Sequence, residues 1–208
     1  ALHFAVIYGC EIKLFNLILS KINDVNAVDD EGLTALMLKM QDPYQKIKHF
    51  DYYSEMMENV LAMVTSLLRN PKIDANLRSN SKSGWRMNEQ TALMFAIKTY
   101  GPSIRYSQLS FGGNTVNSNN GIEVIRDTGE KIMLELIKKS DLSIFGGHKQ
   151  GSDGRRNFLG FNALHHVIWY GCREKVFDAI LAKIKKHGID VNTPTRDSKK
   201  DNDQYNKE

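Results

Sequence analysis

The stretch ALHFAVIYGCEIKLFNLILSKINDVN occupies residues 1–26, and much of it returns near the other end of the chain. The segment ALHHVIWYGCREKVFDAILAKI at 163–184 aligns with residues 1–22 without a gap, and IDVN at 189–192 matches NDVN at 23–26 after four extra residues. Fifteen of the 26 aligned positions are identical. Chance does not give this level of identity, so we interpret the two stretches as copies one and four of a repeated unit.

Two further copies lie between these. TALMLKM begins at Thr34 and TALMFAI begins at Thr91, and each is followed by an apolar helical stretch and a closing motif. The alanines that open the four copies are spaced by 34, 57 and 71 residues: Ala1, Ala35, Ala92 and Ala163. A unit of about 34 residues with insertions in its two connections accounts for these spacings.

The apolar pattern of each unit predicts two short helices. In copy one, residues 1–8 are compact and apolar, and Gly9 is expected to end the first helix as a left-handed cap residue. Leu14–Ile22 then carries apolar residues at helical spacing, which predicts the second helix, and copy four repeats this pattern over Val176–Ile184. Because two short helices cannot bury their own apolar faces, units of this kind stack on one another.

A short polar motif closes each unit. Asp24-Val25-Asn26 closes copy one, Asp74-Ala75-Asn76 closes copy two and Asp141-Leu142-Ser143 closes copy three. We therefore predict an all-α fold, a repeat solenoid of about four helix-turn-helix units with long insertions in the middle repeats. The expected boundaries are a repeat domain at 1–195 with units at about 1–32, 33–88, 89–159 and 160–195, and a charged tail or linker at 196–208.

Composition narrows the function classes. Of the 208 residues, 25% are charged and 41% are hydrophobic, which is typical of soluble globular proteins. No apolar run approaches the roughly 20 residues that a membrane span needs, so we expect no membrane span. The net charge of +4 is mildly basic and lacks the concentrated basic stripe of a nucleic-acid-binding protein. Since Ala1 is not a natural start, we expect an upstream segment to be missing.

The only two cysteines, Cys10 and Cys172, both follow Tyr-Gly and occupy equivalent places in copies one and four. Two intervening units at roughly 10 Å each would hold them about 30 Å apart, beyond the reach of a disulfide. We interpret both as small buried hydrophobic residues. A zinc site would need more ligands at short spacing, such as a cysteine pair two residues apart, and the sequence has no such pair, so we expect no zinc site. The lack of a cysteine-rich framework favours a reducing compartment.

These motifs resemble those of the ankyrin-repeat family. The family unit reads Asp-x-x-Gly-x-Thr-Pro-Leu-His-x-Ala-Ala-x-x-Gly, followed by a Val/Leu-rich second helix and Gly-Ala-Asp-Val-Asn. The counterparts here are DDEGLTAL at 29–36, ALHFAVIYG at 1–9, and Asp-Val-Asn at 24–26 and 190–192. The resemblance extends over nearly the whole chain, up to about Thr195.

The middle copies depart from the family pattern. Alanine replaces the family proline in every opening motif, and the family histidine, kept at His3 and His165, is methionine at Met37 and Met94. The resemblance therefore implies incomplete Thr–His hydrogen bonds in the middle copies. We expect local distortion there.

The resemblance also implies a non-enzymatic module that binds another protein through its finger loops and the concave face of its first helices. It implies no cofactor, no small-molecule substrate and no metal. A partner with an acidic surface fits because basic residues gather in two fingers, whereas nucleic acid is not expected. The candidate partner-binding residues are Arg78, Lys82, Trp85, Arg86, Lys149, Arg155, Arg156 and Trp169.

Plainer alternatives stay open for these residues. The basic side chains can be solvated loop tips, Trp85 can fold onto its own loop, and Trp169 can pack against the preceding unit. His165, His166 and Cys172 could in principle form a nucleophilic pair. However, His165 stands at the structural histidine of the family and Cys172 has a twin in Cys10, so we expect no catalytic residue.

A second reading of the whole chain is an ankyrin targeting segment of a larger protein, such as a secreted bacterial effector whose catalytic domain lies outside these residues. Long insertions and a composition rich in lysine and asparagine would suit such an effector. This alternative therefore rests on analogy alone. The expected location is the cytoplasm, or the host cytoplasm in the case of a secreted effector.

Overall fold

The structure of the chain is a computed structural model. It describes residues 1–41, 53–80, 89–101, 110–111, 114–115, 119–144 and 161–190. This part of the chain is all-α, with eight helices and one ladder of two short strands. The helices are α1 (Leu2–Tyr8), α2 (Ile12–Lys21), α3 (Ala35–Gln41), α4 (Tyr53–Arg69), α5 (Ala92–Tyr100), α6 (Asn119–Lys139), α7 (Ala163–Tyr170) and α8 (Glu174–His187).

The predicted glycine caps are confirmed. Gly9 ends α1 with φ 68°, and its backbone N–H donates to the carbonyl oxygen of Ala5. Gly171 ends α7 in the same way, with φ 71° and its N–H on the carbonyl of Val167. Glycine adopts positive φ without a steric penalty, so the chain can turn sharply at this point into the second helix.

Polar residues cap the starts of three first helices. The hydroxyl oxygens of Thr34 and Thr91 accept hydrogen bonds from backbone N–H groups three residues on, at 3.3 and 3.4 Å. In α7 the cap is Asn162, whose side chain accepts from the backbone N–H of His165 at 3.1 Å. In return, Nδ1 of His165 accepts a hydrogen bond from the backbone N–H of Asn162 at 3.3 Å. The two hydrogen bonds together form a capping box.

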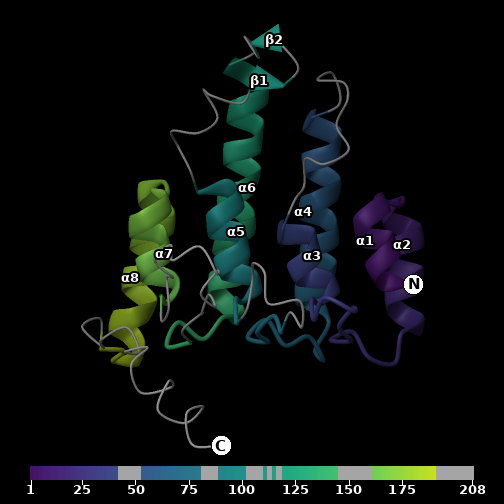
Figure 1. The fold of residues 1–208 in the computed structure, drawn as a ribbon, viewed down its shortest axis with the longest axis horizontal. Helices are drawn as coiled ribbons and strands as arrows, with labels where there is room; N and C mark the ends of the chain where they lie inside the picture. Colours follow the sequence, from purple (N-terminus) through teal and green to yellow (C-terminus); the bar gives the residue numbers. More distant parts are fainter. Residues whose placement is uncertain are drawn as a thin grey trace, which may run out of the picture.

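The helices pack in chain order. Among first helices, α1 contacts α3, α3 contacts α5, and α5 contacts α7. Among second helices, α2 contacts α4, α4 contacts α6, and α6 contacts α8. Figure 1 shows the result, with the pair α1–α2 at one end of the molecule and the pair α7–α8 at the other.

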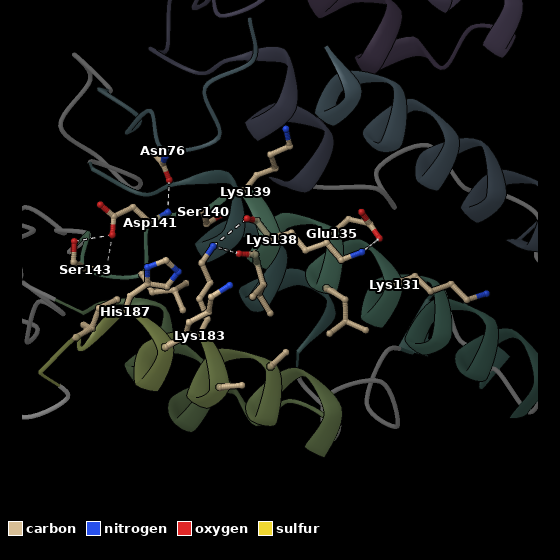
Figure 2. Close-up of a pocket in the computed structure, with 17 residues that line it drawn as sticks. Asn76, Lys131, Glu135, Lys138, Lys139, Ser140, Asp141, Ser143, Lys183 and His187 are labelled. Atoms are coloured by element: carbon tan, nitrogen blue, oxygen red, sulfur yellow. Dashed lines mark hydrogen bonds and ion pairs between the residues drawn. The ribbon is translucent and has the colours of Figure 1, made fainter. Parts of the chain in front are cut away.

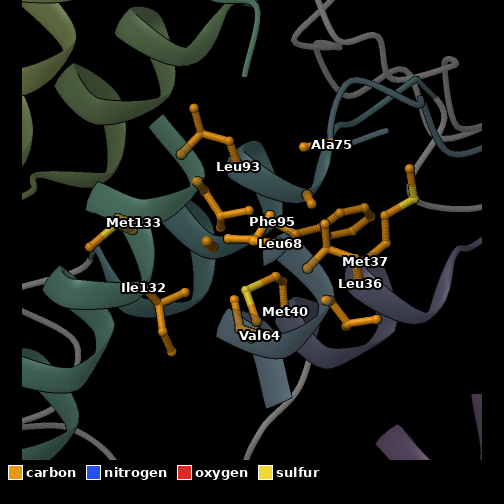
Figure 3. Packing of buried hydrophobic residues seen from close by; sticks show 14 of the residues in the cluster. Leu36, Met37, Met40, Val64, Leu68, Ala75, Leu93, Phe95, Ile132 and Met133 are labelled. Carbon is orange, nitrogen blue, oxygen red and sulfur yellow. The ribbon is translucent and has the colours of Figure 1, made fainter. Parts of the chain in front are cut away.

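The apolar core runs between these helices, and side chains from α3, α4, α5 and α6 meet in it (Figure 3). Seven of the nine residues of α5 are buried. Met37 and Met94, which stand where the family has histidine, are each 1% exposed. A thioether is apolar and adaptable enough to fill such a site without a hydrogen-bond partner, and α3 and α5 run without a break through both positions.

The closing motifs fold alike in the first three copies. The backbone N–H groups of Asn26, Asn76 and Ser143 each donate, at 2.9 Å, to the aspartate side chain two residues earlier. Two of these residues also reach the next closing turn. The Asn26 side-chain oxygen accepts from the backbone N–H of Asp74 at 2.9 Å, and the Asn76 oxygen accepts from that of Asp141.

The insertions lengthen the middle second helices, which the sequence did not predict. α4 has 17 residues and α6 has 21, against 10 in α2. One of the long insertions predicted for the middle repeats follows α5, and its last residues belong to α6, which begins at Asn119. Within the same insertion, β1 (Ser110–Phe111) pairs antiparallel with β2 (Asn114–Thr115). This ladder lies beyond the start of α6, at the opposite end from the connections between helix pairs (Figure 1).

Candidate functional site

A groove of about 1050 Å³ lies between α6 and α8, close to the last turns of both helices (Figure 2). Its apolar lining comes from both helices and from the residues that follow them: Leu134, Ile137, Leu142, Ala179, Ala182 and Ile189. Two positions of α8 that line it are alanines, Ala179 and Ala182. Short side chains at these positions leave room that leucine or methionine would fill.

The groove is predominantly basic. Its cationic or titratable basic side chains are Lys131, Lys138, Lys139, Lys183, Lys186 and His187, against the two carboxylates Glu135 and Asp141. Lys138 pairs with Glu135 on the same helix. Several of these residues occupy the last turns of α6 and α8, where positive charge offsets the negative end of the helix dipole. The same charges give the groove a positive rim.

Lys183 links the two helices across the groove. Its Nζ donates to the carbonyl oxygens of Ile137 and Lys138, and the second of these bonds is 3.1 Å long. These carbonyls lie in the last turn of α6 and have no partner within the helix, so Lys183 satisfies them from the neighbouring helix. Burial lowers the pKa of Lys183, although the nearby carboxylate of Asp141 opposes this effect.

Asp141 stays ionised at the edge of the groove. A hydrogen bond from the Ser143 hydroxyl, followed by one from the Ser143 backbone, lowers the pKa of this carboxyl, and Lys183 and His187 act in the same direction. The groove therefore offers fixed positive charge beside an apolar floor. An extended or helical segment with carboxylates and a few apolar side chains would match this groove in charge and in polarity.

Of the predicted finger residues, only Arg78 lies in the described part of the chain. Its guanidinium forms an ion pair with Glu89, with Nη1 and Oε2 3.5 Å apart, and both side chains are about half exposed. The positive charge of this finger is therefore partly balanced within the finger itself. Lys82, Trp85, Arg86, Lys149, Arg155 and Arg156 lie outside the described residues, as does the tail at 196–208.

Trp169 is 59% exposed near the end of α7. Its ring centroid lies 6.4 Å from that of Phe161, which precedes the same helix. Packing against the preceding unit, the plainer interpretation of this residue, would bury more of the side chain. An exposed indole of this size is the kind of residue that anchors protein interfaces.

The surroundings of Cys172 and His165 fit structural roles for both residues. Burial raises the pKa of the Cys172 thiol to about 12, and only the thiolate is an effective nucleophile. Burial lowers the pKa of His165, whose ring forms part of the capping box with Asn162. Both cysteines are free thiols, but they are half-buried rather than fully buried as predicted. Each closes a first helix at the edge of the core, where one side of the residue meets solvent.

Among the residues that the structure describes, no group of three or more His, Cys, Asp or Glu side chains is placed to hold a metal ion. None of the helices found there is both long enough and apolar enough to cross a membrane.

Sequence reasoning missed the groove between α6 and α8 because it assigned the basic residues to the fingers. A signal was present, since Lys131, Lys138 and Lys139 recur at helical spacing on one element and Lys183 and Lys186 recur on another. That these two helices are neighbours follows only from the packing order.

No protein-family model matches the chain, and no curated protein matches it. The resemblance to ankyrin repeats therefore rests on the motifs quoted above.

Proposed function

We propose that the chain is an ankyrin-type repeat module, a non-enzymatic solenoid that recognises an acidic segment of another protein. The observation that carries the proposal is the packing order, in which first helices contact first helices and second helices contact second helices from one end to the other. Arrays of this kind present long continuous surfaces to macromolecular partners rather than an enclosed site for a small molecule.

The repeated details support the same interpretation. Glycine with positive φ ends the first helix in copies one and four, and the same aspartate-centred turn closes copies one to three. These features recur where the sequence motifs recur. Copies of one supersecondary unit have this property, whereas an irregular helical bundle does not require it.

Charge suggests the chemistry of the partner. The groove between α6 and α8 carries five lysines against two carboxylates, and the fingers add Lys82, Arg86 and the basic residues of 149–156. Complementary charge raises the association rate and orients the partner. The exposed side chain of Trp169 then offers an apolar anchor on a first helix.

The test is quantitative affinity capture with the 208-residue chain as bait. Three baits are compared at low and high salt: the wild type, the double variant Lys139→Glu/Lys186→Glu, and Trp169→Ala. We expect a protein that the wild type retains, that the groove variant loses, and that Trp169→Ala retains less. Its retention should weaken with salt, because the attraction is largely electrostatic.

The matched control is Lys13→Glu/Lys21→Glu, which reverses the same number of charges on α2, at the other end of the molecule. A partner that the control loses as completely as the groove variant would show that net charge alone governs binding. A partner retained equally by all four baits would contradict the proposed surface. Capture dominated by nucleic acid would contradict the proposed partner class.

A further inference from the structure

Asparagines at the first two closing turns tie each of those turns to the next one. The side-chain oxygen of Asn26 accepts a hydrogen bond from the backbone N–H of Asp74 at 2.9 Å, and its amide nitrogen donates to the carbonyl of Lys72 at 2.7 Å. The side-chain oxygen of Asn76 accepts in the same way from the backbone N–H of Asp141. An asparagine side chain therefore crosses the contact between copies one and two, and another crosses the contact between copies two and three.

Serine stands at this position in copy three. The turn itself is unchanged, because the backbone N–H of Ser143 donates to Asp141 at 2.9 Å, as the corresponding asparagines donate to their own aspartates. The serine side chain is shorter than asparagine, however, and its hydroxyl donates back to Asp141 at 2.7 Å. Ser143 therefore stays within its own turn instead of crossing to the next one.

The groove between α6 and α8 opens at this place. Leu142 and Ser143 line it on the side of copy three, and His187 and Ile189 line it on the side of copy four. Figure 2 shows Ser143 and His187 at one end of the groove, with Asp141 beside them. An asparagine at position 143 would extend into this end of the groove, as the asparagines of copies one and two extend across the earlier contacts.

Charge closes the other end of the contact between α6 and α8. Arg173, the N-cap residue of α8, donates to three carboxylates of α6, those of Glu123, Asp127 and Glu130. Ile180, in the middle of α8, is 0% exposed. The opening is thus confined to the last turns of the two helices, so a change at position 143 should alter the groove locally and leave α8 in place.

We infer that Ser143 determines where the acidic segment binds: it keeps this end of the groove open, and so directs the segment to the contact between copies three and four. The inference rests on the proposed function, because it concerns the same groove. The segment crosses the end of the groove where asparagine crosses the earlier contacts, and it meets Lys186, His187 and Ile189 there. Ser143 acts by leaving room, so its own hydroxyl need not contact the partner.

The binding experiment uses a defined probe, a fluorescein-labelled hexapeptide in which glutamate and leucine alternate. Fluorescence anisotropy measures its affinity for the full 208-residue chain. Ser143→Asn keeps every charge of the groove, and we expect it to weaken binding at least about tenfold, because its carboxamide obstructs the peptide. Ser143→Ala leaves the room open and should bind as the wild type does. Asn26→Ser, which changes the contact between copies one and two, should also bind as the wild type does.

Hydrogen exchange without the peptide tests the geometry separately. In Asn26→Ser the backbone N–H of Asp74 loses its acceptor, so it should exchange about tenfold faster than in the wild type. In Ser143→Asn the amides from Lys185 to Ile189, at the end of α8, should exchange more slowly, because the longer side chain covers them. Ser143→Asn should fold, since the Ser143 side chain is exposed and asparagine already occupies the position in two other copies.

The outcomes separate this inference from the proposed function. A wild type that does not bind the peptide would overturn both. If Lys139→Glu/Lys186→Glu loses the peptide while Ser143→Asn binds it as tightly as the wild type does, the groove is correct and the role of Ser143 is wrong. Unchanged exchange at the end of α8 in Ser143→Asn would also overturn the role of Ser143, because the side chain would then not reach across the groove.

Discussion

At the scale of single residues, Gly32 holds two segments of the chain together: the connection between copies one and two, and the connection between copies two and three. Its φ is 73°, and its carbonyl oxygen accepts a hydrogen bond from the backbone N–H of Asn80 at 3.2 Å. A Cβ atom at Gly32 would lie 2.3 Å from the carbonyl oxygen of Asn80, so it could not fit without moving backbone. Glycine is thus required here both for the backbone conformation and for the close approach of the second connection.

We therefore predict that Gly32→Ala lowers the free energy of unfolding by about 3 kcal/mol, from left-handed strain of about 1–2 kcal/mol plus overpacking. Gly9 gives the matched control, since it has φ 68° but a Cβ atom there would meet nothing within 4 Å. Gly9→Ala should lose only the strain, about 1–2 kcal/mol. Urea unfolding measures both variants, and equal losses would show that the contact with Asn80 is unimportant.

Cys172 provides a prediction about reactivity. Its Sγ lies close to Gly101, at the end of α5, and burial raises its pKa to about 12. At a mildly alkaline pH the folded protein should therefore contain almost no Cys172 thiolate. We predict that iodoacetamide labels Cys172 about a hundredfold more slowly in the native protein than in urea. Peptide mass spectrometry with free cysteine as an internal standard reports both rates, and similar rates would show that the thiol is not shielded.

At the scale of elements, position within the row of first helices decides what a side chain contributes. Phe4 and Phe95 occupy the same position of copies one and three, but one is 65% exposed and the other 1% exposed. We predict that Phe95→Ala costs about 3–5 kcal/mol in unfolding free energy, whereas Phe4→Ala costs less than about 1 kcal/mol. Thermal and urea unfolding of dilute samples measure the difference. Comparable losses would contradict the packing order.

The helices could be predicted from sequence where the signals are local. Gly9 and the apolar spacing of Leu14–Ile22 fix the end of one helix and the existence of the next, because both depend on neighbouring residues. The extended starts of α4 and α6 could not be predicted in this way. The inserted residues that form them are mostly polar, such as Asn119 and Asn120 at the start of α6, and they show no clear apolar periodicity.

The candidate site was harder to predict than the helices. The sequence suggested two interpretations of Trp169, a partner-binding residue or a side chain packed against the preceding unit. The structure leaves its side chain 59% exposed, and its role in binding stays a prediction. The sequence could not show that Arg78 pairs with Glu89, a residue at the other end of the connection between copies two and three. Nor could it show that lysines of α6 and α8 share one groove, because that depends on which helices become neighbours. Contacts between distant segments are set by packing, which no short window of sequence contains.

At the scale of the whole molecule, the inner helices and the end helices have different support. Within the described residues, α3 to α6 have neighbouring helix pairs on both sides, whereas α1–α2 and α7–α8 have a neighbour on one side only. In a row of units joined only to their neighbours, each missing contact lowers local stability. Opening should therefore begin at the two ends.

We predict that native-state hydrogen exchange of a dilute sample is slowest in α3, α5 and α6 and fastest in α1 and α8. Mass spectrometry of proteolytic fragments taken after exchange reports the protection of each helix separately. Protection that is equal along the whole row of helices would contradict the nearest-neighbour packing.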